Sequence, residues 1–140
     1  MTTSSPARAE APPPPPPALS NATPTQLFAS VEGAWSSGDV EALAALVDTT
    51  SVRIGLKPGA QPTAAMTRSS AAFLFQDQLR LVTTRSFQIL SLNVNKATAT
   101  ATASWMGDWG GRQGVRRLTV RMRAAPVSGR WVLREVRVKG

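Results

Sequence analysis

The chain has 140 residues, 42% of them hydrophobic, and a formal net charge of +8, which indicates one soluble domain with an ordinary core. It contains no cysteine, histidine or tyrosine. These absences exclude disulfides, Cys-His and Ser-His-Asp nucleophiles, and metal sites that depend on His or Cys ligands. We therefore expect no metal and no cofactor, and we do not expect catalysis.

The positive charge is concentrated toward the C-terminus. From residue 112 onward there are nine basic residues and one acid, Glu135, whereas residues 1–111 hold seven of each sign. Any electrostatic footprint therefore belongs to the last part of the chain. The alternative is a coding bias toward arginine, which the 13 arginines against three lysines also fit.

Residues 1–24 contain eight prolines, six of them in the run 12–17. Consecutive prolines form a stiff polyproline II rod, so we expect a disordered tail or spacer, with a ligand for a PxxP-reading partner as the alternative. No signal-peptide pattern or membrane-spanning stretch is present. This predicts a cytoplasmic protein, or an extracytoplasmic one if an anchor precedes the spacer.

Two short helices are expected after this tail. Apolar side chains recur at three- and four-residue spacing in 25–37, which predicts a helix capped by Thr25 and ended by Gly38. Asp39 then caps a second helix, whose apolar side chains run from Val40 to Val47.

A strand and a third helix follow. The alternation of 51–56 predicts a strand closed by a turn at 57–59. Ser69 or Ser70 can cap the third helix. Its apolar stripe comprises Ala71, Leu74, Phe75, Gln78, Leu79 and Val82.

Four strands are then expected in succession. The first spans 86–92, with Phe87 and Ile89 on one face and Leu90 and Leu92 on the other, and 93–96 forms a turn. The second begins in the stretch KATATATASW at 96–105, with Ala97 and the alternate residues up to Trp105 on one face. A loop of at least seven residues, starting with the glycine-rich segment 107–111, ends it.

The last two strands carry the basic residues. The alternation of 115–125 places Leu118, Val120 and Met122 on one face and arginines on the other, and a turn at 126–129 leads to the final strand at 130–138. Large apolar side chains of the helices and of the final strand are expected in the core: Phe28, Trp35, Phe73, Leu74, Phe75, Trp131 and Leu133.

The order α-α-β-α-β-β-β-β indicates the α+β class, with helices segregated from a curled antiparallel sheet. Two motifs accompany it: an Ala-x-x-Ser-Gly-Asp break at 34–39 and a closing Gly-x-Trp-x-Leu motif at 129–133. With them the chain resembles the nuclear-transport-factor-2-like superfamily, which includes SnoaL-like proteins and ketosteroid isomerases. The match covers residues 25–139 and is nearest to uncharacterised bacterial domains, which share Ser86-Phe87 and a Leu-x-Glu-x-Arg ending at 133–137.

The resemblance implies a cystatin-like cone, a single domain at 25–140 and a homodimer formed through the sheet. Isomerases of this fold use a catalytic Asp with a Tyr-based oxyanion hole, and this chain has no tyrosine. Epoxide-hydrolase-type relatives use an Asp-Arg-Asp set. Asp48, Asp77 and Asp108 are present here, but Asp77 and Asp108 fall at positions typical of solvated side chains.

The candidate binding residues are Arg117, Arg121, Arg123, Arg137, Glu135 and Trp109. Guanidinium groups on a sheet can hold phosphates, carboxylates or an acidic partner, and Trp105 and Trp109 are expected nearby for stacking. Trp109 is expected to be a contact residue because it lies in a glycine-rich loop. The alternative is a solvated face on which Glu135 pairs with one arginine, and nucleic acid is disfavoured because no RNA-binding signature is present.

We therefore expect a non-catalytic binding or interaction module of a bacterial protein, dimerising through its sheet. Two alternatives stay open. One is a small-molecule pocket protein or an isomerase- or hydrolase-like enzyme. The other is binding of an anionic ligand or acidic protein through the C-terminal arginine strands.

Overall fold

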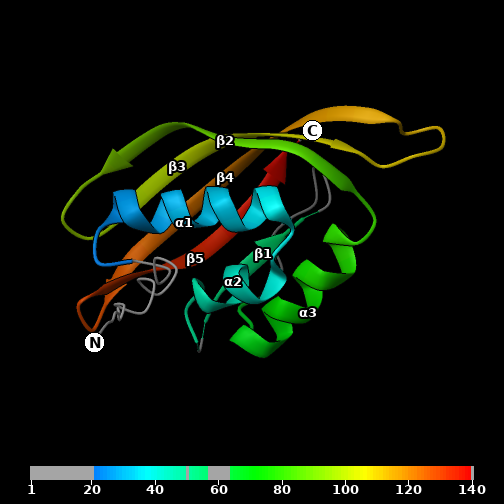
Figure 1. The fold of residues 1–140 in the computed structure, drawn as a ribbon. Coiled ribbons are helices and arrows are strands. Elements are labelled where there is room, and N and C mark those ends of the chain that lie inside the picture. Colours follow the sequence, from blue (N-terminus) through cyan, green and yellow to red (C-terminus); the bar gives the residue numbers. More distant parts are fainter. Residues whose placement is uncertain (1–20, 50, 57–63, 140) are drawn as a thin grey trace, which may run out of the picture.

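The computed structural model describes residues 21–49, 51–56 and 64–139, and the proline-rich run and the predicted turn at 57–59 lie outside them. The elements are α1 Pro24–Ser37, α2 Val40–Ala45, β1 Arg53–Gly55, α3 Arg68–Leu79, β2 Thr83–Val94, β3 Ala99–Asp108, β4 Val115–Val127 and β5 Arg130–Lys139. This order confirms the predicted α+β arrangement. Figure 1 shows the three helices gathered on one side of a curled sheet. Among the described helices, none has the length and apolar character to cross a membrane.

The sheet has the strand order β1-β5-β4-β3-β2. Strands β2 to β5 form the predicted antiparallel meander, but β1 pairs with β5 in parallel, so the sheet is mixed rather than antiparallel throughout. A parallel pair requires a long crossover between its strands. Here the connection between β1 and β5 consists of α3 and the strands β2, β3 and β4, which carry the backbone to the far edge of the sheet and back.

Local capping differs from the prediction at two helices. Thr23, not Thr25, caps α1: its hydroxyl accepts a hydrogen bond from the Gln26 amide over 3.1 Å, and Pro24 occupies the first helical position, where no amide proton is needed. Gly38 ends α1 with a φ of 71°, and Asp39 caps α2, as expected. Thr67, not Ser69 or Ser70, caps α3.

Helix α3 buries Ala71, Phe75 and Leu79 and ends at Leu79, before Val82. Phe73, predicted as a core residue, is 72% exposed. Two residues along a helix correspond to a rotation of about 200°, so a side chain midway between Ala71 and Phe75 points away from the face that these two bury. The prediction for Phe73 was therefore wrong.

Strand β2 contains a bulge at Leu90 that changes which side chains face the helices. Ile89 lies opposite Ala103 and Ser91 opposite Thr102, so Leu90 has no partner and is 63% exposed. Leu92 then lies opposite the buried Ala101, on the same side as Phe87. The prediction that Leu92 shares a face with Leu90 was wrong because the extra residue reverses the alternation.

The alternating stretch forms β3 from Ala99 onward, with its alternate alanines and Trp105 on one face as predicted, and that face is buried. Ala97 is not part of the strand. The side-chain oxygen of Asn95 accepts bonds from the amides of Ala97 and Thr98, at 3.0 and 2.8 Å, and this Asx-type turn closes the hairpin.

Strand β3 continues through Gly107 and Asp108, so the loop is limited to residues 109–114 and is shorter than predicted. A Cβ at Gly107 would lie 2.5 Å from Val82 Cγ2 and 3.2 Å from the Trp109 ring, so this position has no room for a side chain. At the other end, β4 extends to Val127, and the turn to β5 consists of Ser128 and Gly129, both with positive φ.

Four aromatic rings pack against one another in the interior between the helices and the sheet. Trp35 from α1 stacks on Phe87 from β2 with centroids 4.5 Å apart, and it meets Trp105 and Phe75 edge-on at 5.1 and 5.9 Å. All four side chains are almost fully buried. They confirm the core positions predicted for Trp35 and Phe75.

Candidate functional site

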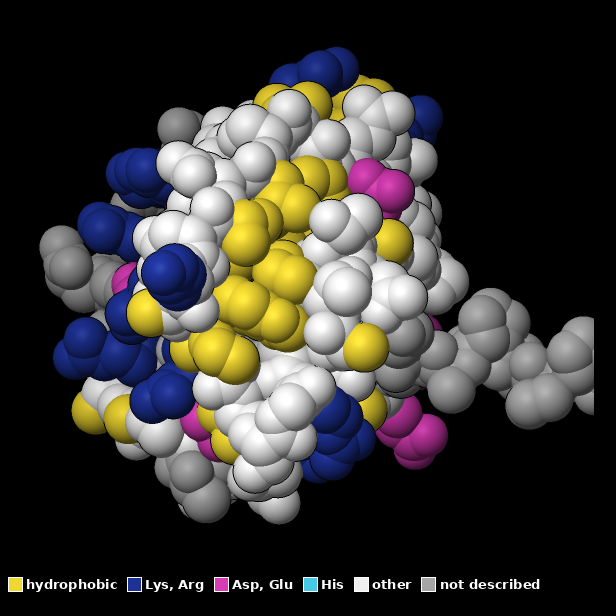
Figure 2. All heavy atoms as spheres, turned by 90° about the vertical axis from the view of Figure 1, so that its left-hand side faces the viewer, with side chains coloured by type: hydrophobic (Ala, Val, Ile, Leu, Met, Phe, Trp, Pro, Cys, Tyr) yellow, Lys and Arg dark blue, Asp and Glu magenta, His cyan; other side chains and the backbone are white. Residues whose placement is uncertain are grey.

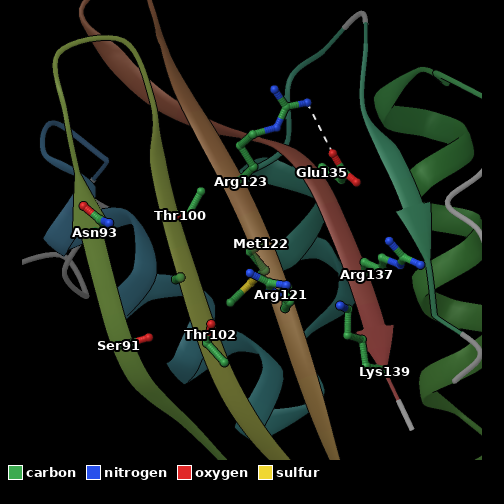
Figure 3. Close-up of a pocket in the computed structure, with 11 residues that line it drawn as sticks. Ser91, Asn93, Thr100, Thr102, Arg121, Met122, Arg123, Glu135, Arg137 and Lys139 are labelled. Carbon is green, nitrogen blue, oxygen red and sulfur yellow. Dashed lines mark hydrogen bonds and ion pairs between the residues drawn. The ribbon is translucent and has the colours of Figure 1, made fainter. Parts of the chain in front are cut away.

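A groove of about 400 Å³ crosses the face of the sheet that the helices leave uncovered (Figure 3). We call it the outer groove. Strands β2 and β3 supply hydroxyl and amide side chains along one half, and β4 and β5 supply charged side chains along the other half. Its lining consists of Ser91, Asn93, Thr100, Ala101, Thr102, Arg121, Met122, Arg123, Glu135, Arg137 and Lys139.

Strand register arranges these side chains in rows that run across the strands. In the first, the Arg121 row, Ser91 lies opposite Thr102, Thr102 opposite Arg121, and Arg121 opposite Arg137. The second is the Glu135 row. In it, each side chain lies opposite the next one across the strands, in the order Asn93, Thr100, Arg123, Glu135 and Arg53. Direct cross-strand neighbours have Cβ atoms about 5 Å apart, so members of a row are within contact reach.

The two rows differ in charge balance. Glu135 binds the guanidinium of Arg123 over 3.3 Å and also lies opposite Arg53 on its other side. The Arg121 row has no acid: Arg137 is flanked by Arg121 and by Gly55, which has no side chain. The Nε atom of Arg137 is buried and has no hydrogen-bond partner. The Arg121 row therefore holds two adjacent positive charges without a compensating carboxylate.

The structure brings together four of the six predicted binding residues: Arg121, Arg123, Arg137 and Glu135 all line the outer groove. Arg117 lies on the same face but further along β4, where its guanidinium contacts the sulfur of Met106 at 3.9 Å. Sequence reasoning missed Lys139 and the polar side chains of β2 and β3. The signal was present, because Lys139 continues the alternation of Glu135 and Arg137, and the threonines alternate with the buried alanines.

Trp109 is placed apart from the groove. It is partly buried against Trp105, with ring centroids 5.1 Å apart, and it lines a shallow hollow with Arg80, Val82 and Asp108. Trp105 is 1% exposed and faces the helices. The expected stacking surface beside the arginines is therefore wrong, because both rings lie toward the core side of the sheet and the arginines on the other.

The aspartates considered for an Asp-Arg-Asp set are dispersed. Asp48, after α2, is buried and binds Arg134 at 3.4 Å, whereas Asp77 on α3 pairs with Arg80 at 3.2 Å in solvent. Asp108 pairs with Arg85 at 3.5 Å and accepts a bond from the Gly110 amide. Within the described ranges, no group of three acidic side chains converges as a metal site would require.

A second surface feature is apolar. Figure 2 shows hydrophobic side chains collected at the end of the molecule where the β2–β3 and β4–β5 hairpins and the start of α1 lie, with basic side chains to one side. Val94 at the end of β2 is 49% exposed and Val127 at the end of β4 is 39% exposed. Trp131, predicted as core, is only partly buried here, and its backbone exchanges hydrogen bonds with Asn21.

Comparison with known proteins identifies the fold. A DUF4783 family protein from Bacteroides ovatus superposes with a TM-score of 0.67 at 13% identity, over 79% of this chain and 92% of that one. An uncharacterised protein with a cystatin-like fold from Caulobacter vibrioides gives 0.64 at 12% identity, over 82% and 84% of the two chains. An NTF-2 like protein of unknown function from Shewanella oneidensis gives 0.60 at 12% identity, over 83% and 95%.

These likenesses show that the chain has the nuclear-transport-factor-2-like, cystatin-like fold, which confirms the resemblance drawn from the sequence. No family model and no curated protein matches the sequence. Folds of this kind host unrelated functions, so function has to be argued from the site.

Proposed function

We propose that this protein is a non-catalytic binding module that holds an acidic segment of a partner protein in the outer groove. The observation that carries the proposal is the pairing of Arg121 with Arg137 across β4 and β5. Like charges at directly opposed positions destabilise a sheet. An anionic partner would neutralise the repulsion between these two guanidinium groups. Because the free protein keeps this unfavourable interaction, binding of such a partner is favoured.

The charge of the whole face favours the same kind of partner. Arg117, Arg121, Arg123, Arg137 and Lys139 project from β4 and β5, with Glu135 as the acid among them. A patch of one sign raises the local concentration of oppositely charged partners and accelerates their association. An extended segment laid along the strands would place alternate side chains about 7 Å apart, which matches the spacing of Arg121 and Arg123.

Protein is favoured over nucleic acid as the partner because the groove offers no ring for a base. Its lining contains hydroxyl, amide and charged side chains, with Met122 as its largest apolar member. Base stacking on aromatic side chains supplies much of the affinity for single strands. Carboxylate and phosphate groups, by contrast, need only the guanidinium and hydroxyl donors that are present.

The homodimer through the sheet stays a prediction, and the charge of this face bears on it. Two copies placed with these faces together would set the basic surface that contains Arg121, Arg137 and Lys139 in one copy against the basic surface of the other. Desolvating like charges against one another is costly. We therefore propose that this face of the sheet is not the dimer surface and that the outer groove faces a partner of opposite charge. Light scattering of the purified chain gives its oligomeric state, and a dimer whose affinity changes in Arg121→Glu would contradict the proposal.

The binding test uses a fluorescein-labelled acidic peptide of about ten residues, alternating Glu and Gly, titrated with the full chain at low salt. We expect the double variant Arg121→Ala, Arg137→Ala to weaken binding about tenfold, and binding to fall as NaCl rises from about 50 to about 300 mM. Arg116→Ala is the matched control for Arg121→Ala alone: each removes one positive charge from β4, but Arg116 lies opposite Gly107, on the other face.

Three outcomes would overturn the proposal. The first is no binding of the acidic peptide at low salt, and the second is equal peptide affinity of the double variant and the Arg116→Ala control. The third is tighter binding of an oligothymidine than of an acidic peptide of the same charge. The last result would assign the groove to single-stranded nucleic acid.

A further inference from the structure

We infer that the Arg121 row, comprising Ser91, Thr102, Arg121 and Arg137, is a subsite for a phosphate monoester carried by the bound segment. This inference rests on the function proposed above and adds the chemical class of one group on the partner. It separates the Arg121 row from the Glu135 row, which lies beside it in the same groove.

Charge matching selects the kind of anion. The Arg121 row presents two positive charges, and Glu135 is already engaged by Arg123 at 3.3 Å. A carboxylate supplies one negative charge and leaves one guanidinium uncompensated, whereas a phosphate monoester carries about −1.5 to −2 at neutral pH. A dianion therefore neutralises the row, and a single carboxylate does not.

The donors in the row also suit a tetrahedral group. Arg137 supplies the second guanidinium of the row, and its buried Nε has no hydrogen-bond partner in the free protein. Arg121 reaches from the neighbouring strand, and the hydroxyls of Thr102 and Ser91 continue the row on β3 and β2. Guanidinium forks bind phosphate oxygens in pairs, and three acceptor oxygens can use donors on both sides of the groove. Figure 3 shows Arg121 and Thr102 on the neighbouring strands β4 and β3, while the Arg137 side chain extends from β5 toward β1, so it has to turn toward Arg121 to share one phosphate group.

Lys139 extends the positive end of the subsite. It lies one outward position beyond Arg137 on β5, opposite Thr119, and lines the groove. Its ammonium group adds attraction for a dianion without imposing geometry. The charged groups that face the subsite are thus Arg121 and Arg123 from β4 with Glu135, Arg137 and Lys139 from β5, while β1 contributes Gly55.

The test compares three labelled peptides that differ at one central residue: phosphoserine, glutamate and serine, each flanked by the same acidic residues. We expect the phosphoserine peptide to bind the full chain about tenfold more tightly than the glutamate peptide. Arg121→Ala and Arg137→Ala should each abolish that preference, whereas Arg116→Ala should keep it. Equal affinities for the phosphoserine and glutamate peptides would overturn the subsite while leaving the proposed function intact.

A pH series separates charge matching from general attraction. The second ionisation of a phosphate monoester has a pKa near 6, so the dianionic fraction rises about fourfold between about pH 5.5 and about pH 7.5. The chain has no histidine or cysteine, so over most of this range the change belongs to the ligand. Affinity for the phosphoserine peptide should rise by that factor and affinity for the glutamate peptide should not. A flat profile for both would contradict the inference.

Competition identifies the source of the phosphate. Inorganic phosphate, added at constant ionic strength, should displace the phosphoserine peptide at millimolar concentration if the row binds the group itself. Failure to displace it would contradict the subsite. If inorganic phosphate displaces the peptide at a concentration as low as that of the peptide itself, the peptide chain contributes nothing to binding. That result would contradict a protein segment as the ligand and would assign the groove to a free phosphate compound.

Discussion

The Trp35 indole lies almost parallel to the Phe87 ring, with centroids 4.5 Å apart and planes 17° from parallel. This contact connects α1 to β2, and the edge-on contacts of the same indole with Phe75 and Trp105 connect it to α3 and β3. One side chain thus joins four elements at the centre of the core. Its replacement tests how the interior is held together.

We predict that Trp105→Phe destabilises the protein more than Trp35→Phe does. Both changes remove the same part of an indole, but Trp105 Nε1 donates to the Thr84 hydroxyl over 3.1 Å, whereas the buried Trp35 Nε1 has no partner. Loss of that hydrogen bond adds about 1 kcal/mol to the cost of Trp105→Phe. Urea unfolding followed by circular dichroism measures both, with Thr84→Val closing a double-mutant cycle. Equal losses would show that the hydrogen bond contributes nothing.

Reversing the charge of Arg121 should change stability and binding in opposite directions. Arg121→Glu places a carboxylate opposite Arg137, which we expect to stabilise the fold by about 0.2–0.5 kcal/mol, at the low end for cross-strand pairs because Arg121 is solvated. The same variant should no longer bind the acidic peptide, because the added carboxylate repels it. Thermal unfolding and fluorescence anisotropy are the two measurements.

Arg116→Glu is the control for this reversal because it makes the same change of net charge opposite Gly107. It should leave peptide affinity within about twofold and give no stabilisation. If Arg121→Glu is stabilised and still binds the peptide, the outer groove is not the binding surface. If it is not stabilised, the repulsion between Arg121 and Arg137 is absent in solution.

Glu32 should protect the edge of the sheet. Strand β2 is an outer strand, and the amide of Ile89, beside the bulge, donates to the Glu32 carboxylate over 2.7 Å. We expect Glu32→Ala to cost about 1–2 kcal/mol and to accelerate hydrogen exchange at Ile89. Glu32→Gln retains an acceptor and should cost about half as much. Unchanged exchange at Ile89 in the alanine variant would contradict this role.

Two glycines of the first helical segment should respond with opposite sign to alanine. Gly33 lies inside α1, where an added Cβ meets no atom within 4 Å, so Gly33→Ala should stabilise by about 0.5–1 kcal/mol. Gly38 has a φ of 71°, so Gly38→Ala should destabilise by about 1 kcal/mol. Chemical denaturation of the pair tests both signs. Stabilisation of both variants would mean that the left-handed cap is not maintained.

The order of elements could be predicted from the sequence because it depends on local periodicity. The alternation of alanine and threonine fixes which face of β3 is buried, and the spacing of Ala71, Phe75 and Leu79 fixes the buried face of α3. The buried face of each element can be predicted from its own residues, without knowing which elements pack beside it. The arginine face of β4 was predictable for the same reason.

Features that depend on a neighbouring strand were not predictable. The bulge at Leu90 is defined by the pairing of β2 with β3, and the parallel direction of β1 is defined by its contact with β5. Phe73 was misplaced because an apolar residue was assumed to be buried without regard to its angle on the helix.

The site was predictable in part. Sequence alternation identified Arg121, Arg123, Glu135 and Arg137 as one face, but it could not show that Arg121 lies opposite Arg137 while Glu135 lies opposite Arg123. That distinction depends on the hairpin at Ser128 and Gly129 and on the register shift beside Arg123. The same register decides which row lacks an acid.

Strand β4 also sets how the protein can change over evolutionary time. Its buried side chains alternate with its solvent-facing ones, so, apart from Met122, which also lines the outer groove, a point mutation reaches either the core or the outer groove. Partner preference can therefore drift at positions such as Arg121 while Val120 and Met122 stay constant. The insertion or deletion of one residue within the strand would instead exchange the two sets, bury arginines and expose the core. Selection should hold the length of β4 fixed while its outward composition varies.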